Sequence, residues 1–211
     1  MITFADAIRT NPMIAILRGL DPSNAVAVAD VLVDAGFRII EVPMNSPQPL
    51  RSIERIQARH GERAIVGAGT VLTAEDVHAV ADLGAGIIVS PNLDVAVGEA
   101  AVARGLAWCP GVFTPTEAFA ALRIGASVLK FFPAELVPPA AIAAMRAVLP
   151  ADAIVAAVGG ITPEAMAAYR AAGADGFGLG SALFKPGYPI EEIAERARRF
   201  VAALDELGGR A

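Results

Sequence analysis

Lys130 is the residue of this chain whose surroundings point most directly to covalent chemistry. It lies in the middle of an apolar run, residues 128–133 (VLKFFP), that predicts a buried strand. A buried ammonium group is costly unless it is paired or loses its proton, and a neutral lysine amine can attack a carbonyl carbon. Only two of the 17 basic residues are lysines, and arginine cannot replace them in an imine because it stays protonated. The alternative is a lysine that joins a structural ion pair or reaches solvent from the end of its strand.

Glu41 is a second ionisable residue within an apolar run, at residues 39–43 (IIEVP). Burial raises the pKa of a carboxyl group, and a carboxyl that titrates near neutral pH can act as a general acid and base. We therefore expect Glu41 to transfer protons to and from a reacting molecule. A structural ion pair with Arg38 or Arg18 is the competing interpretation.

Arg18 and Thr70 come at the ends of the first and third predicted strands. A guanidinium group there could bind a substrate carboxylate through two hydrogen bonds, or could simply be solvated in its loop. The Thr70 hydroxyl could donate a hydrogen bond to the same ligand, or Thr70 could serve only as a β-forming residue at the end of its strand.

Two glycine turns late in the chain have the composition of a phosphate site. They are residues 159–163 (GGITP) and 178–181 (GLGS), and each leads into a predicted helix. Glycine lets backbone N–H groups approach an anion closely, and the helix dipole adds to the attraction. The candidate residues are Gly159, Gly160, Gly180 and Ser181. Ordinary tight turns are the alternative.

Eight β-branched runs alternate with alanine-rich segments, a pattern typical of a parallel sheet covered by helices. The strands are expected at residues 13–17, 39–43, 64–70, 86–91, 107–112, 127–133, 153–160 and 176–180. This count predicts an α/β protein with one (β/α)8 TIM-barrel domain over residues 1–211, with a short N-terminal helix at residues 4–10. Barrel enzymes that bind phosphate often do so after strands seven and eight, where both glycine turns fall. An open doubly wound sheet would place its glycine-rich turn near the start of the chain instead.

Side chains that precede a proline mark the expected starts of several helices. These predicted N-caps are Asp21, Ser46, Thr114 and Thr162. Glycines such as Gly36 and Gly125 come where a helix is expected to end.

The composition excludes several classes of protein. A net charge of −5 with scattered arginines leaves no basic patch for nucleic acid, and no apolar run approaches the roughly 18 residues of a membrane span. The lone Cys109 cannot form an internal disulfide, which fits a cytoplasmic location, and the first residues lack a signal-peptide pattern. His60, His78 and Cys109 do not have the spacing of a metal site, so we expect no metal and no other cofactor. Lys185 lies in a loop and is expected to be solvated.

A buried amine, a proton-transferring carboxyl, a carboxylate-binding cation and a phosphate cradle are the parts of a Schiff-base enzyme for a phosphorylated keto acid. The residues by themselves leave three other classes open. In an isomerase or epimerase, Glu41 would be the base and Lys130 would neutralise an enolate. A phosphate-ligand binding module would have no turnover, and a class II aldolase would need a metal.

The chain resembles the class I 2-keto-3-deoxy-6-phosphogluconate and 6-phosphogalactonate aldolases over essentially its whole length. The matching segments, in order, are residues 16–19 (ILRG), 41–47 (EVPMNSP), 67–72 (GAGTVL), 129–133 (LKFFP) and 158–161 (VGGI). The resemblance implies that Lys130 forms the imine and that Glu41 donates and accepts protons. It also places Arg18 and Thr70 at the keto-acid end of the ligand and Gly160, Gly180 and Ser181 at its phosphate, and it implies a homotrimer.

Val158 and the segment after Glu41 separate the two types of enzyme. The gluconate enzymes typically have Leu-Arg-Thr after the glutamate strand and a threonine at the position of Val158, whereas this chain reads Met44-Asn45-Ser46-Pro47, similar to the galactonate type. The substrates differ in configuration at C4, where a threonine hydroxyl can form a hydrogen bond and valine cannot. We expect cleavage of 2-dehydro-3-deoxy-6-phospho-D-galactonate to pyruvate and D-glyceraldehyde 3-phosphate, with the gluconate epimer as the alternative substrate.

Overall fold

The strands form a single parallel sheet in this computed structural model, which describes residues 2–208. Residue 1 and residues 209–211 of the predicted domain lie outside the described part. The strands are β1 (Met13–Ile16), β2 (Ile39–Pro43), β3 (Ile65–Gly69), β4 (Ile87–Val89), β5 (Ala107–Cys109), β6 (Gly111–Val112), β7 (Leu129–Phe131), β8 (Val155–Val158) and β9 (Gly176–Leu179). Their order is β5-β4-β3-β2-β1-β9-β8-β7-β6. Since only Pro110 separates β5 from β6, the two act as one interrupted strand that joins the edges of the sheet. The predicted (β/α)8 barrel is confirmed.

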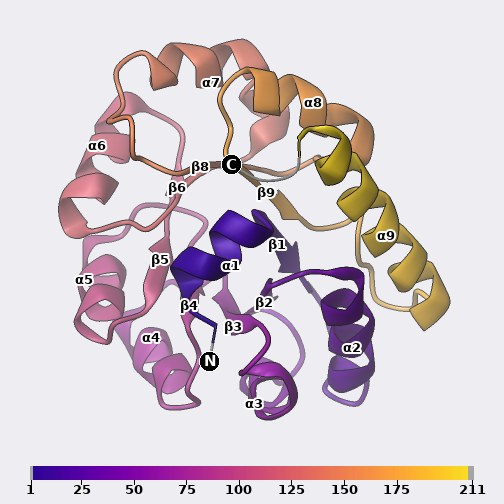
Figure 1. The fold of residues 1–211 in the computed structure, drawn as a ribbon. Coiled ribbons are helices and arrows are strands. Elements are labelled where there is room, and N and C mark those ends of the chain that lie inside the picture. Colours follow the sequence, from indigo (N-terminus) through magenta and orange to yellow (C-terminus); the bar gives the residue numbers. More distant parts are fainter. Residues whose placement is uncertain (1, 209–211) are drawn as a thin grey trace.

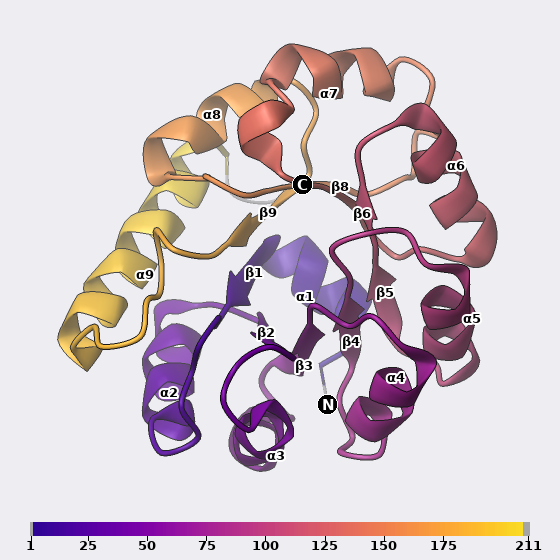
Figure 2. The same ribbon diagram turned by 180° about the vertical axis from the view of Figure 1, so that it is seen from behind.

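Helices surround the sheet in a ring, and one short helix covers an end of the barrel (Figure 1). The ring consists of α2 (Ala25–Ala35), α3 (Pro49–His60), α4 (Ala74–Ala81), α5 (Val95–Ala103), α6 (Pro115–Ile124), α7 (Pro139–Arg146), α8 (Pro163–Ala171) and α9 (Ile190–Glu206), with a 3-10 turn η1 (Ala134–Leu136) before α7. Helix α1 (Phe4–Thr10), the predicted N-terminal helix, lies across the end where the strands begin. Figure 2 shows the opposite end, where the strands finish and their loops converge.

Local capping signals predicted some helix starts and missed others. Thr114 caps α6, and its hydroxyl exchanges hydrogen bonds with Glu117 in a capping box. Helices α2 and α3 begin later than predicted, so the predicted N-caps Asp21 and Ser46 are wrong. The reason is that both polar side chains serve the loops instead. Asp21 accepts a 2.8 Å hydrogen bond from the Ser23 N–H, and the Ser46 hydroxyl accepts one of 2.9 Å from the Gly19 N–H.

The other predicted helix boundaries, one N-cap and two glycine ends, have mixed outcomes. Thr162 precedes α8 with an extended backbone, but its hydroxyl makes no capping hydrogen bond within the described residues. Gly36 and Gly125 end α2 and α6 with φ angles of 117° and 111°, in the left-handed region that glycine adopts without strain. These two glycine caps are confirmed.

Strand residues alternate between two apolar layers, and this alternation positions the functional side chains. One layer fills the barrel and includes Ile14, Ile16, Ile39, Val128 and Val158. The other packs between sheet and helices and includes Met13, Ala15, Ile40, Val42 and Leu129. Because Glu41 is two residues after Ile39 and Lys130 is two after Val128, both point into the barrel.

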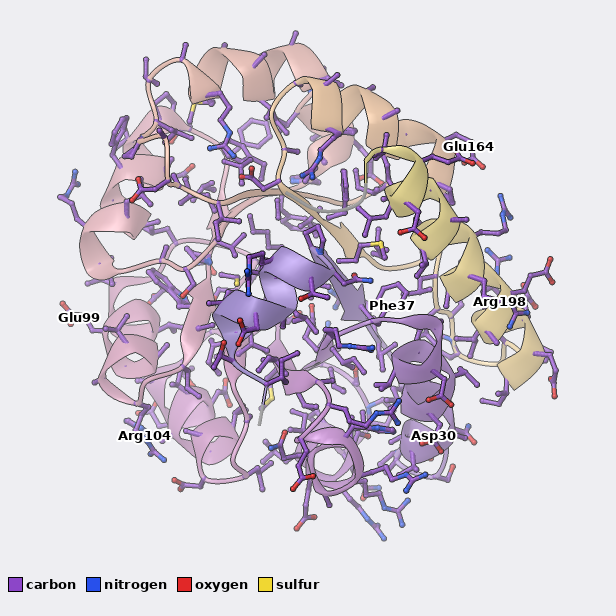
Figure 3. All side chains as sticks on the ribbon, in the orientation of Figure 1. Asp30, Phe37, Glu99, Arg104, Glu164 and Arg198 are labelled. Carbon is purple, nitrogen blue, oxygen red and sulfur yellow. The ribbon has the colours of Figure 1, made fainter. Side chains whose placement is uncertain are left out.

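Charged side chains gather on the outside of the helix ring. In Figure 3, Glu99, Arg104, Glu164 and Arg198 lie at the outer edge, whereas Phe37 lies inside. Phe37 is fully buried. Within residues 2–208, no helix has both the length and the apolar character to cross a membrane.

Candidate active site

Lys130 presents a buried amine to the inside of the barrel. The residue is only 7% exposed, and its Nζ donates a 3.2 Å hydrogen bond to the backbone carbonyl of Ser90. The ring of Phe132 lies with its centroid 4.6 Å from the same nitrogen. Burial lowers the pKa of Lys130, and the nearby Glu41 carboxylate opposes part of this shift. The protein therefore favours the neutral, nucleophilic amine more than water does.

Glu41 faces Lys130 from the opposite wall. Strands β2 and β7 are separated by three strands on either side of the closed sheet, counting β5 and β6 as one. Glu41 is 2% exposed, and burial raises its pKa to about 7, against the opposing effect of the positive charges of Lys130 and Arg18. Its Oε2 has no hydrogen-bond partner among the described residues. A buried carboxyl that titrates near neutral pH with a free oxygen is equipped to transfer protons.

The structural ion pairs considered for Glu41 are not formed. Arg38 donates its hydrogen bonds to the backbone carbonyls of Val33 and Phe37. Within residues 2–208, no ion pair joins Glu41 with Arg18, Arg38 or Lys130. The carboxyl is therefore available to a ligand.

A pocket opens above these two residues at the end where the strands finish. Its volume is about 540 Å³, within the range of roughly 300–1,000 Å³ found for small-molecule sites. Ile16 and Val158 line both this pocket and the narrow space inside the barrel that Glu41 and Lys130 also line. Val158, which is 4% exposed, thus lies at the passage between the amine and the wider pocket. Cys109 is a fully buried neighbour of these residues. Burial raises the pKa of its thiol to about 12, which is typical of an inert thiol.

Arg18 is held over one side of the mouth. One guanidinium nitrogen donates a 2.7 Å hydrogen bond to Asn45 Oδ1, and the other donates to Thr70 Oγ1 at 3.4 Å. Thr70 has a φ of 53°, a left-handed conformation that is unfavourable for a β-branched residue and is typical of functional sites. Two residues from separate predicted strands, Arg18 and Thr70, are therefore brought together as expected. Asn45 was not predicted to take part, although its place in the loop after the Glu41 strand was a usable signal.

The glycine turns line the same pocket. Gly159 and Gly160 have φ angles of 106° and 66°. Successive backbone N–H groups of a turn can point into one concave surface, which is a common way to bind an anion. Gly180 and Ser181 line the pocket as well. The structure thus brings all four candidate phosphate residues together.

Four residues near these groups were not predicted to take part. The Ser90 carbonyl and the Phe132 ring contact the Lys130 amine, as described above. Glu135 and Lys185 line the pocket beside the glycine turns. The prediction that Lys185 is solvent-exposed is confirmed. No feature of the sequence indicated that its loop folds back to the mouth.

The histidines lie apart from the pocket, as expected. His60 ends α3 and its Nε2 lies 2.8 Å from Asp30 Oδ1, while His78 is in α4 near Arg104. Across residues 2–208, no three His, Cys, Asp or Glu side chains are grouped so that they could hold a metal ion.

Comparisons with known proteins agree with this geometry. The family model for KDPG and KHG aldolase matches residues 4–193. A probable 2-dehydro-3-deoxy-6-phosphogalactonate aldolase of Rhizobium meliloti (strain 1021) is 49% identical over 198 residues, covering 94% of this chain and 93% of the relative. The 2-dehydro-3-deoxy-6-phosphogalactonate aldolase of Escherichia coli (strain K12) is 48% identical over 195 residues, covering 92% and 95%.

A solved structure described as native KDPGal is similar as well. It superposes with a TM-score of 0.92 at 47% identity, covering 93% of this chain and 96% of that one. Three relatives named as 2-dehydro-3-deoxy-phosphogluconate aldolases are more distant, at 31–35% identity. The chain therefore belongs to the KDPG and KHG aldolase family, whose members are carbon–carbon lyases.

Proposed function

We propose that this protein is a class I aldolase that cleaves 2-dehydro-3-deoxy-6-phospho-D-galactonate to pyruvate and D-glyceraldehyde 3-phosphate. The observation that carries the proposal is the buried Lys130 amine facing the Glu41 carboxyl beneath a pocket that Arg18 and both glycine turns line. Arg18 supplies a cation at one end, where it binds the substrate carboxylate with Thr70. Gly159, Gly160, Gly180 and Ser181 form the phosphate site at the other.

Lys130 begins the reaction as a neutral amine that attacks the C2 ketone. Glu41, in its protonated form, gives a proton to the departing hydroxyl as the carbinolamine loses water and becomes an iminium. The C4 hydroxyl then gives up its proton to the Glu41 carboxylate as the C3–C4 bond breaks. The bonding electrons pass to the iminium, which becomes an enamine, and glyceraldehyde 3-phosphate leaves. Glu41 returns the proton to C3, and water hydrolyses the resulting imine to pyruvate and free Lys130.

The two ends of the pocket orient the reacting carbons. Binding energy from the carboxylate and phosphate ends can be used to hold C2 over the amine, which lowers the entropic cost of the covalent step. The proposal assigns no role to a metal ion or to any other cofactor. Full activity in the presence of EDTA is therefore expected.

Val158 is proposed to set the preference between C4 epimers. It lies at the passage from the amine to the phosphate cradle, where C4 of a substrate bound to both would pass. Its methyl groups offer no hydrogen bond to a C4 hydroxyl, unlike the threonine of the gluconate type. The relatives named for phosphogalactonate are also more similar to this chain than those named for phosphogluconate.

Steady-state cleavage of the two epimeric phosphosugar acids tests the function and its specificity together. We expect a kcat/KM at least about tenfold higher for the galactonate epimer. Val158→Thr should narrow or reverse this ratio, while Val158→Ile should keep it. Cleavage of neither epimer would contradict the proposed reaction, and a wild-type preference for the gluconate epimer would contradict the assigned substrate.

A homotrimer is part of the proposal. Three large apolar side chains lie exposed after neighbouring strands at the mouth: Leu72 (53%), Val95 (52%) and Phe113 (49%). They follow β3, β4 and β6 respectively, so they occupy one sector of the rim. Exposed apolar residues that gather in this way mark an interaction surface.

Light scattering should give the mass of three chains for the wild-type protein. Leu72→Glu is expected to release monomers because it places a charge in the contact. Val148→Glu is the matched control, since Val148 is equally exposed (57%) but follows α7 at the other end of the barrel. A wild-type monomer would exclude the trimer, and an intact trimer in the Leu72 variant would exclude this surface.

A further inference from the structure

The proposed phosphate site has a carboxyl group in its wall. The Glu135 carboxyl lies directly against the glycine turn, where a Cβ placed on Gly160 would be 2.9 Å from Glu135 Cδ. A phosphate monoester carries a charge of about −1.5 to −2 at pH 7. Backbone N–H groups contribute only partial charges, so Glu135 weakens the attraction for the anion. A cation beside the site would offset this effect.

Lys185 is the side chain placed to supply that cation. Within residues 2–208, the charged residues that line the pocket are Arg18, Glu135 and Lys185. Arg18 is bound to Asn45 and Thr70 at the keto-acid end. Lys185 lines the same pocket from the loop that continues from Gly180 and Ser181.

The backbone of this loop is fixed on both sides of Lys185. Phe184 before it is 6% exposed, and its N–H donates a 2.9 Å hydrogen bond to the Gly180 carbonyl. Pro186 after it packs on Gly19, where an added Cβ would lie 2.7 Å from Pro186 Cγ. The root of the Lys185 side chain is therefore held beside the pocket, while its exposed end remains free to reach a ligand.

The end of the loop is braced through Tyr188. The guanidinium of Arg196 lies 4.7 Å from the centre of the Tyr188 ring and donates a 3.0 Å hydrogen bond to the Ala182 carbonyl. Lys185 Nζ lies 6.0 Å from the same ring, at the outer limit of a cation–π contact. This contact is weak, so a phosphate group can draw the ammonium away at little cost.

We infer that Lys185 binds the phosphate group of the substrate and, against the opposing carboxylate of Glu135, sets the selectivity for phosphorylated over unphosphorylated sugar acids. Lysine suits this role because it acts as a mobile point charge towards phosphate. The inference rests on the proposed function, since it assigns a determinant of specificity to the same pocket.

Lys185→Met tests the inference with two substrates, the phosphosugar acid and the same keto-deoxy sugar acid without phosphate. The expected result is a KM for the phosphorylated substrate that rises about tenfold, with the KM for the unphosphorylated substrate unchanged. Lys185→Arg should largely restore the wild-type KM. Glu135→Gln should act in the opposite direction and lower the KM for the phosphorylated substrate alone. Added salt should raise that KM less in Lys185→Met than in the wild type.

Arg198→Met is the matched control, because it removes another exposed cation, on the outer side of α9 (Figure 3). It should leave both KM values unchanged. Equal changes for the two substrates in Lys185→Met, or no change for either, would overturn the inference. If Lys185→Arg raised the KM for the phosphorylated substrate as much as Lys185→Met does, the argument from positive charge would be overturned as well.

Trapping of pyruvate separates this inference from the proposed function. Pyruvate has no phosphate, so borohydride should reduce a pyruvate imine on Lys130 equally well in the wild type and in Lys185→Met. A wild-type protein that traps no pyruvate would contradict the proposed function. Normal trapping in both proteins, with the phosphate preference retained in Lys185→Met, would contradict only the role of Lys185.

Discussion

Lys130→Met is expected to reduce aldol cleavage by on the order of 10⁴-fold or more, because the covalent route is lost together with the amine. Methionine preserves much of the side-chain volume but has no nitrogen that could attack the ketone. The change should be measured as the cleavage rate and, separately, as the mass of the protein after treatment with pyruvate and borohydride. Wild-type protein should carry one pyruvate-derived adduct, and peptide mapping should place it on Lys130.

The stability of Lys130→Met distinguishes lost chemistry from lost folding. Burial lowers the pKa of Lys130 in the folded state, so the unfolded chain holds its proton more tightly. The buried amine therefore lowers the free energy of unfolding at neutral pH. This loss is recovered as the pH rises from the pKa of Lys130 in the folded protein towards its pKa in the unfolded chain, about 10.5. Replacing the amine with an apolar group removes this cost, and we expect a Tm at pH 7 no lower than that of the wild type. The catalytic assignment would be refuted if Lys130→Met cleaved substrate at the wild-type rate, or if the pyruvate adduct of the wild-type protein were found on Lys185.

Glu41→Gln is expected to lower kcat by about 10²–10⁴-fold, the usual contribution of a general acid and base. Glutamine fills the same space but cannot accept a proton from the C4 hydroxyl or return one to C3. Because the pKa of Glu41 is raised to about 7, the wild-type pH–rate profile should bend near neutral pH. The profile of the variant should lose that bend.

The same variant tests the raised pKa through stability. A carboxyl whose pKa is higher in the folded state destabilises the fold when it ionises, so stability falls as the pH rises from 4.5 through about 7. The full difference is on the order of 3 kcal/mol above this range. For the wild type, we expect urea unfolding to give a lower free energy of unfolding at pH 8 than at pH 5. For Glu41→Gln, we expect this difference to be absent.

Glu99→Gln serves as the control for Glu41→Gln, because Glu99 is an exposed carboxyl on the outside of α5 (Figure 3). It should leave kcat, the pH–rate profile and the pH dependence of stability as in the wild type. If Glu41→Gln retained kcat within about threefold, the proton-transfer role would be excluded. An unchanged pH dependence of stability in Glu41→Gln would exclude the raised pKa.

The features that the sequence determined by itself are those that depend on nearby residues. The alternation of strand residues placed Glu41 on the same strand face as Ile39, and Lys130 on the same face as Val128. Side chains two residues apart share a face of a strand. The capping box of Thr114 joins residues only three apart, and it was predictable for the same reason. The repeated strand–helix pattern then placed the ends of all the strands at one mouth.

The tertiary structure decided which distant groups meet there. Arg18 meets Asn45 across 27 residues of chain, and the Lys130 amine meets the Ser90 carbonyl across 40. The late start of α3, like the place of Lys185 in the pocket, depends on loops that pack against other loops. No local pattern encodes such contacts, since they form only when the barrel closes and brings the strand ends together. The sequence therefore determined the barrel and its two central ionisable groups, and the closed fold decided what holds and surrounds them.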